Sequence, residues 1–215
     1  MSTFRIISLR ARGFTVIELM IAIAIFGLVL LFVATAIMQV SRIYYRNITE
    51  TKVQNTNRDL VDSISRAIQF NGGTVTDTDP GAVGGSATYT FCIGNQQYSY
   101  KLGQQLVEGT AGANQSRRVL VVRTLAGCTS SSLPPSMTNP AAAGREILTP
   151  KMRIARLEIK SAGSDYYTIK SRIVYGDIDL LNNPTADNAS CKNITSGTQF
   201  CAVSDITAAV AKRVK

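Results

Sequence analysis

The first third of the chain combines a long apolar run with a later, helix-like alternation of apolar and polar positions. From Leu19 to Met38 the sequence contains no charged side chain. Because an α-helix rises about 1.5 Å per residue, about 20 such residues cross a hydrocarbon core of about 30 Å. The run therefore predicts a membrane-spanning helix over residues 14–40.

The helical pattern continues beyond this span. Apolar side chains recur at spacings of three, four and seven residues, and charged side chains occupy the remaining faces. The apolar positions are Val53, Leu60, Ile64, Ala67 and Ile68. Asn71, Gly72 and Gly73 follow Phe70 and form a helix-breaking sequence. We therefore expect one helix over residues 14–70, about 85 Å long if unbroken, whose amphipathic half at 41–70 packs against a globular head.

Short segments with the alternation of β-strands follow a polar, glycine-rich stretch at residues 71–87. The predicted strands cover residues 87–92, 97–102, 118–124, 151–160 and 165–175. The short segment 161–165 predicts a hairpin between the last two strands, whereas 128–150, rich in proline and serine, is expected to be a loop. The sequence thus predicts an α+β protein: a long N-terminal α-helix packed on an antiparallel β-sheet head over residues 71–215.

The residues before the apolar run do not resemble an ordinary secretory signal. Residues 1–13 contain Arg5, Arg10 and Arg12 and no acidic side chain. A secretory signal places small residues after its apolar stretch, whereas here Gly13 comes before it. A simple N-terminal anchor, held in the cytoplasm by its arginines, is the plain alternative. That alternative leaves the single carboxylate, Glu18, unexplained.

The junction Gly13-Phe14-Thr15-Val16-Ile17-Glu18-Leu19-Met20, after a basic leader, resembles the processing signal of the type IV pilin and type II secretion pseudopilin superfamily. The resemblance implies that residues 1–13 are a prepilin leader peptide, cut between Gly13 and Phe14 by a prepilin peptidase that then methylates Phe14. It also implies that Glu18 pairs with the buried N-terminal amine of a neighbouring subunit during assembly, since a buried charge is tolerated when it is paired. The alternative for Glu18 is a carboxylate that only reaches toward the membrane surface.

The same resemblance implies the partners and the location. They are other pilin subunits, the prepilin peptidase, an inner-membrane assembly platform and membrane lipid, with the chain first in the inner membrane and later in a periplasmic or extracellular filament. The head sequence is similar, more loosely, to minor pilins of the PilW and GspJ kind. Many filament-forming pilins carry a proline where this chain has Thr35, although Gly27 matches a glycine frequent among them. This difference favours a low-abundance role that primes or supports a pilus or secretion filament.

The four cysteines form an even set in a domain that the resemblance implies to be exported, which favours disulfides. Three pairings are possible. We favour Cys191 with Cys201, which closes a short loop, and Cys92 with Cys128. A zinc site is disfavoured because the chain has no histidine and no C-x-x-C pair.

The formal net charge of +9 leaves a second function open. Several basic residues fall in the predicted sheet: Arg117, Arg118, Arg123, Lys151, Arg153, Arg156, Lys170 and Arg172. Such a face could bind DNA phosphates, an acidic surface or lipid head groups. An ordinary solvated face is favoured, because no array of aromatic side chains for base stacking accompanies the charges. A DNA-binding pilin and a single-span anchored receptor domain remain the alternatives to a filament subunit.

Catalysis and cofactors are not expected. Without histidine the chain has no Ser-His or Cys-His nucleophile, so the sequence predicts neither an enzyme nor a bound cofactor. Asp177 and Asp179 lie near several asparagines and give a weak calcium candidate, because some pseudopilins bind calcium in a C-terminal loop. Their spacing does not follow the EF-hand pattern, and solvated turn residues are the favoured interpretation.

Overall fold

The computed structural model describes residues 13–70, 75, 87–129, 134–163, 165–193 and 197–213. The leader arginines Arg5, Arg10 and Arg12, and nearly all of the predicted loop at 71–87, lie outside the described residues. The chain separates into two compact units, residues 1–43 and residues 44–215, and each is described by itself.

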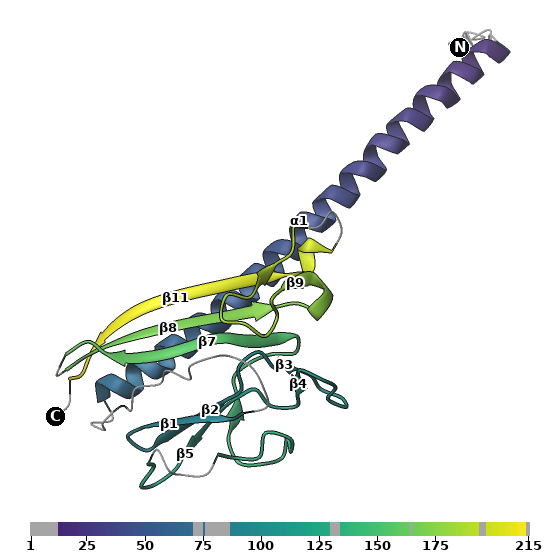
Figure 1. Ribbon diagram of the computed structural model, residues 1–215. Coiled ribbons are helices and arrows are strands. Elements are labelled where there is room, and N and C mark those ends of the chain that lie inside the picture. Colours follow the sequence, from purple (N-terminus) through teal and green to yellow (C-terminus); the bar gives the residue numbers. More distant parts are fainter. Residues whose placement is uncertain are drawn as a thin grey trace, which may run out of the picture. The chain divides into compact units, whose positions relative to one another are not determined.

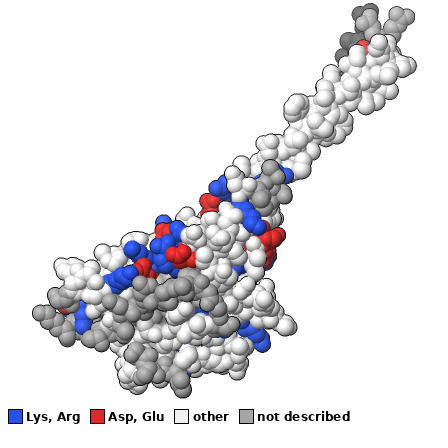
Figure 2. All heavy atoms as spheres, viewed as in Figure 1, with Lys and Arg blue, Asp and Glu red and all other residues white. Residues whose placement is uncertain are grey.

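A single helix, α1, covers Val16–Phe70 and confirms the long helix predicted from the periodicity. In the first unit every described residue is exposed, and from Leu19 to Met38 no side chain is charged. The helix is long and apolar enough to cross a membrane, with a mean hydropathy of 2.9 in its most apolar window. In the view of Figure 2 the outer part of this helix is white, apart from acidic colour near its beginning.

The second unit contains the amphipathic part of α1. Its buried residues are Thr49, Val53, Asn57, Leu60, Val61, Ile64, Ala67 and Ile68. This stripe includes all of the apolar positions predicted to face the head. It also includes an asparagine, whose contacts are described below.

A three-stranded antiparallel sheet, in the order β11-β8-β7, packs on this helix (Figure 1). Its strands are β7 (Met152–Ser161), β8 (Tyr166–Tyr175) and β11 (Ala202–Ala211). Side chains of β8 alternate from Tyr166 to Ile173, with Tyr167, Ile169, Ser171 and Ile173 buried on the side of the helix. The pairing of β7 with β8 shifts register between Ile154 and Arg156, which indicates a β-bulge.

A second sheet, in the order β1-β2-β5-β6, completes the head. Its strands are β1 (Tyr89–Ile93), β2 (Gln96–Tyr100), β5 (Leu120–Thr124) and β6 (Arg145–Glu146). Two short pairs accompany it: β3 (Gln105–Leu106) with β4 (Gln115–Ser116), and β9 (Leu181–Asn182) with β10 (Ser190–Cys191). Two 3-10 helices, η1 (Ile178–Leu180) and η2 (Thr198–Phe200), lie in the C-terminal loops.

One large apolar cluster joins the helix to both sheets. It includes Ile64 of α1, Phe91 and Tyr98 of the second sheet, and Ile159 and Ile169 of the first. A smaller cluster around Val174 and Leu181 lies under the loop that carries β9 and β10. The head is therefore one core with a small satellite, which fits the predicted α+β architecture.

The structure differs from the predicted strands in several places, the short strands β3, β4, β9 and β10 among them. The strand β11 was not predicted, because its sequence is rich in alanine, which has low strand propensity. The described part of the head has two larger sheets and two short strand pairs rather than one sheet. Within the stretch 128–150, predicted as a loop, the short strand β6 pairs with β5 through Val121 and Glu146.

Candidate functional site

The start of α1 is organised by Thr15 and Glu18. The carbonyl of Thr15 accepts a hydrogen bond from the Leu19 N–H, so Thr15 caps the helix. The Glu18 carboxylate accepts from the Thr15 N–H at 2.9 Å and from the Thr15 hydroxyl at 2.8 Å. In return, the Glu18 N–H donates to the Thr15 hydroxyl at 3.3 Å. This reciprocal arrangement is a capping box.

The capping box gives Glu18 a local role in addition to the one implied by the resemblance. It satisfies backbone donors that would otherwise be unpaired at the helix start, and it places a negative charge where the helix dipole favours one. The carboxylate is thereby held against Thr15, two residues after the predicted cut. The sequence carries the signal for this capping box as Thr-x-x-Glu at residues 15–18.

Gly13 and Phe14 precede the helix and are exposed. A Cβ added at Gly13 would have no atom within 4 Å. The described fold therefore contains no close approach that demands glycine at this position. A requirement for a small residue would have to come from something that binds this segment, such as a processing enzyme.

Gly27 shows the same property inside the apolar helix. A Cβ added there would also meet no atom within 4 Å. Glycine in a helix costs about 1 kcal/mol relative to alanine, and no contact of the isolated chain offsets this cost. Small residues in membrane helices allow close approach of another helix, so this position fits a helix that packs in an assembly.

Comparison with known proteins adds one positive finding. A family model described as the prokaryotic N-terminal methylation motif matches residues 8–34. The match covers the basic leader's end, Gly13, Phe14, Glu18 and most of the apolar segment. It identifies a type IV pilin-like prepilin signal and supports the pilin and pseudopilin superfamily. No curated protein and no solved structure shows significant similarity to the chain.

The structure links the cysteines as Cys92 with Cys128 and Cys191 with Cys201. This is the pairing favoured from the sequence. The first link joins β1 to the loop after β5. The second joins β10 to the residue directly after η2, so it fixes the loop that carries η2 beside the sheet.

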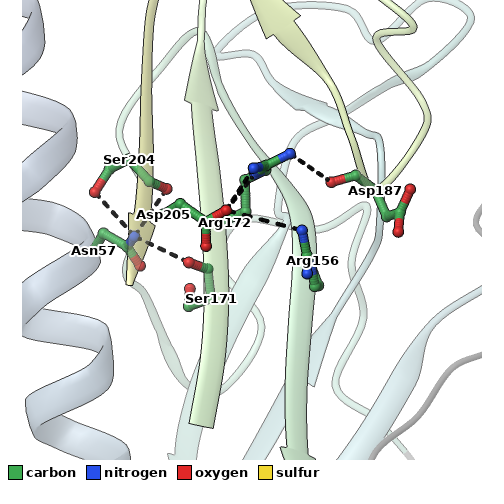
Figure 3. Close-up of polar contacts among 7 residues, drawn as sticks. All are labelled: Asn57, Arg156, Ser171, Arg172, Asp187, Ser204 and Asp205. Atoms are coloured by element: carbon green, nitrogen blue, oxygen red, sulfur yellow. Dashed lines mark hydrogen bonds and ion pairs between the residues drawn. The ribbon is translucent and has the colours of Figure 1, made fainter. Parts of the chain in front are cut away.

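The outer face of the three-stranded sheet carries an ion cluster across all three strands (Figure 3). Asp205 of β11 pairs with Arg172 of β8, whose Nε donates to the carboxylate at 2.8 Å. Arg156 of β7 lies 3.8 Å from the same carboxylate oxygen. Arg172 also donates to the Asp187 carbonyl at 3.4 Å. Two of the predicted basic residues are therefore engaged by a carboxylate.

The helix side of the same sheet carries a polar contact in the core. Asn57 of α1 donates through its amide nitrogen to the carbonyls of Ser171 and Ser204, at 3.3 and 3.0 Å. It donates to the Ser204 hydroxyl at 3.0 Å as well. Figure 3 shows Asn57 directed from the helix toward β8 and β11. This contact fixes the axial position of the helix on the sheet.

Other predicted basic residues are buried. Arg118 donates to the carbonyls of Ser136, Ala142, Ala143 and Gly144, the last at 2.6 Å. Gly144 has φ +107, and a Cβ there would lie 2.6 Å from Val121, so only glycine fits. Arg118 thus holds a loop in place and does not contribute to an external basic face.

Arg153 is fully buried under the loop after β8. It donates to the carbonyls of Gly176 and Pro184, at 3.2 and 3.3 Å. Burial lowers its pKa to about 10, while the nearby charge of Asp177 acts in the opposite direction. Together with Arg118, this residue weakens the argument for a DNA-binding sheet. In Figure 2 the remaining basic and acidic side chains of the head lie interleaved.

Asp177 is held by two neighbours. Its carboxylate accepts from Lys151 Nζ at 2.9 Å and from Gln105 Nε2 at 3.1 Å. Burial raises its pKa, but these hydrogen bonds and the charges of Lys151 and Arg153 outweigh that effect and hold the pKa below its usual value. Asp179 lies in η1. Within the described residues no three His, Cys, Asp or Glu side chains form a metal-binding group. Because Lys151 occupies the Asp177 carboxylate, a calcium ion bound there would have to displace it.

Proposed function

We propose that this chain is a minor pilin or pseudopilin that is incorporated into, or at the tip of, a type IV pilus or related secretion filament, where it primes or supports assembly. The observation that carries the proposal is that the methylation motif coincides with the start of an apolar helix whose side chains are all exposed from residue 16 to residue 43. Such an apolar surface is removed from water by lipid before assembly and by neighbouring helices after assembly.

In this proposal a prepilin peptidase cuts between Gly13 and Phe14 and methylates the new amine of Phe14. Gly13 is exposed, has open space around it and lies outside the helix, so it is accessible to an enzyme. Cleavage leaves the capping box intact, because Thr15 and Glu18 both lie after the cut. The mature helix therefore keeps its carboxylate close to its new N-terminal amine.

Glu18 then serves as the assembly contact. In lipid the carboxylate is held by its own Thr15, which reduces the cost of inserting it. In a filament the amine of an adjacent subunit can add a charged partner to the same carboxylate. The minor role is supported by the helix, which passes Thr35 unbroken, with the Thr35 hydroxyl donating to the Phe32 carbonyl at 2.9 Å. The superfamily supported by the motif consists of structural filament subunits, and we propose no catalytic activity.

Intact-mass measurement of the protein from cells that contain a prepilin peptidase tests this proposal. The expected species begins at Phe14 and carries one added methyl group. Gly13→Glu should block the cut, whereas Gly13→Ala, which adds only a Cβ in open space, should permit it. A mature protein that keeps residues 1–13 in such cells would contradict the proposal.

A further inference from the structure

An exposed aromatic patch lies where α1 enters the head. Tyr44 and Tyr45 of α1 and Phe200 of η2 are 62%, 51% and 46% exposed. The rings of Tyr45 and Phe200 have centroids 5.9 Å apart, and those of Tyr44 and Tyr45 are 6.0 Å apart. We call these three residues the aromatic patch. Large rings held together in water suggest that this surface is covered by something else.

The loop geometry holds Phe200 in this position. Gly197 adopts φ +88 at the start of η2, a conformation suited to glycine. The residue after Phe200 is Cys201, which is linked to Cys191 of β10. The ring is therefore fixed against the helix by a turn on one side and a disulfide on the other, although nothing in the core requires it there.

A polar groove of about 420 Å³ lies next to the aromatic patch. Its lining includes Arg46, Glu50 and Gln54 of α1, and Lys192 and Thr198 of the C-terminal loops. Arg46 pairs with Glu50 at 2.8 Å, and Lys192 Nζ donates to the Asp179 carbonyl at 2.8 Å. The groove therefore offers two cations against one carboxylate, with hydroxyl and amide groups around them.

The place of these features along the chain identifies their partner. Tyr44 and Tyr45 follow the apolar segment after a short polar stretch that contains Arg42. Aromatic rings with one polar edge, together with arginine and lysine, collect at the level of the lipid headgroups where a helix leaves the bilayer. Phe200 and Lys192 come from the far end of the sequence, yet the fold brings them to the same level of the helix as Tyr45 and Arg46.

We propose that the aromatic patch and the adjacent groove form a membrane-surface contact of the head, in which Phe200 enters the headgroup region and Arg46 and Lys192 bind anionic phospholipid headgroups. The contact would set the orientation of the head on the membrane before the subunit is extracted into a filament. This inference rests on α1 spanning the bilayer, as in the proposed function, and adds that the head itself binds the lipid surface.

The absence of tryptophan from the chain permits a direct test. Phe200→Trp in the full chain, reconstituted into vesicles of phosphatidylcholine and phosphatidylglycerol, introduces a single fluorophore at the patch. Lipids brominated near the headgroup end of the acyl chain should quench this tryptophan and shift its emission to the blue. Tyr45→Trp should be quenched together with Phe200→Trp, because the two rings lie 5.9 Å apart.

Two matched variants make the result decisive. Tyr166→Trp places the fluorophore on an exposed tyrosine at the opposite end of β8, about 30 Å away at about 3.3 Å per residue, and should be unquenched. Phe26→Trp lies in the apolar segment and should be quenched by deeply brominated lipid. Quenching at Phe26→Trp with none at Phe200→Trp would overturn the headgroup contact while leaving the span intact. No quenching at Phe26→Trp would overturn the span and, with it, both proposals.

The charge of the groove is tested in the same vesicles. When only one lipid class is brominated, phosphatidylglycerol should quench Phe200→Trp more than phosphatidylcholine does. Adding Lys192→Gln should remove this preference, whereas Lys170→Gln, outside the groove, should not. Equal quenching by the two lipids would overturn the assignment to anionic headgroups. If the emission wavelength changed with the amount of protein per vesicle and not with the brominated lipid, the patch would contact another subunit. That result would also overturn the proposal.

Discussion

Asn57 in the helix donates two hydrogen bonds to Ser204 in β11, one to its carbonyl and one to its hydroxyl, both at 3.0 Å. The contact joins residues that are far apart in the sequence and fully or nearly fully buried. Asn57 also donates to the carbonyl of Ser171 in β8, at 3.3 Å. The amide therefore bridges two neighbouring strands of the sheet, which explains a polar side chain in an otherwise apolar stripe.

We predict that Asn57→Asp destabilises the head more than Asn57→Ala does. The alanine variant removes the buried hydrogen bonds of the Asn57 amide, each worth about 0.5–1.5 kcal/mol. The aspartate variant has the same shape but sets a carboxylate against the carbonyls of Ser171 and Ser204. Urea unfolding of the full chain in detergent measures the free energy of unfolding of both variants. Asn55→Asp, on an exposed face of the same helix, should change stability by less than about 0.5 kcal/mol, and equal losses at the two positions would contradict the contact.

We predict that Glu18→Ala separates membrane insertion from assembly. Removing the carboxylate makes the apolar segment easier to insert, so the level in membranes should hold. Incorporation into sheared filaments should fall strongly, because the amine of a neighbouring subunit loses its partner. Glu18→Gln keeps the shape and a hydrogen-bond acceptor for Thr15, so a defect in this variant too would assign the effect to charge. Asp59→Ala, exposed on the same helix, serves as the control, and normal incorporation of Glu18→Ala would return this residue to a local capping role.

The two disulfides should contribute unequally. In the chain-entropy model a link between residues 10 apart stabilises by about 3 kcal/mol, and one between residues 36 apart by about 4 kcal/mol. Removing Cys92 and Cys128 together should therefore lower the urea midpoint more than removing Cys191 and Cys201. Peptide mapping without reduction checks the pairing first. Peptides that join Cys92 to Cys191 or to Cys201 would contradict the structure.

The pair of Lys151 and Asp177 should stabilise the head over a defined pH range. The pKa of Asp177 is held below its usual value, so its contribution is present above pH 3.8, the ordinary value, and is lost as the pH falls through the lowered pKa. The pKa of Lys151 is raised, chiefly by its hydrogen bond to Asp177, so its contribution is present below pH 10.5 and is lost above it. Both groups are about half exposed, so we expect a total below about 1 kcal/mol.

Thermal unfolding of Asp177→Asn against pH measures this effect. The variant should be less stable than the parent at neutral pH and should match it at strongly acidic pH. Asp179→Asn, on the same turn, is the control and should follow the parent throughout. A constant difference between Asp177→Asn and the parent at all pH values would assign the effect to packing instead of charge.

The helix and most strands could be predicted because their patterns are local. The spacing of Val53, Leu60 and Ile64 defines a helix face without knowledge of its partner, and the alternation around Tyr167 and Ile169 defines a strand. In β11 the larger apolar residues do not alternate, since Val203 lies on the opposite face from Ile206 and Val210. Alanine or polar residues fill the other positions, so neither period is visible.

The candidate site could be predicted only where its chemistry is contiguous. Gly13, Phe14 and Glu18 lie within one short segment, whereas the burial of Arg118 and Arg153 depends on loops distant in the sequence that fold over them. Each arginine ends on backbone carbonyls, which carry no residue-specific signal. The contact between Phe200 and Tyr45 likewise joins residues far apart in the sequence, so no local pattern predicts it.

Helix α1 belongs to both compact units, since the exposed apolar segment and the residues buried in the head lie on one hydrogen-bonded helix. A mechanical load applied to the apolar segment would therefore pass directly into the core of the head. Pulling the helix out of the head would require its buried side chains, with Asn57 among them, to leave the core. A flexible linker between the two units would not couple a load to these side chains.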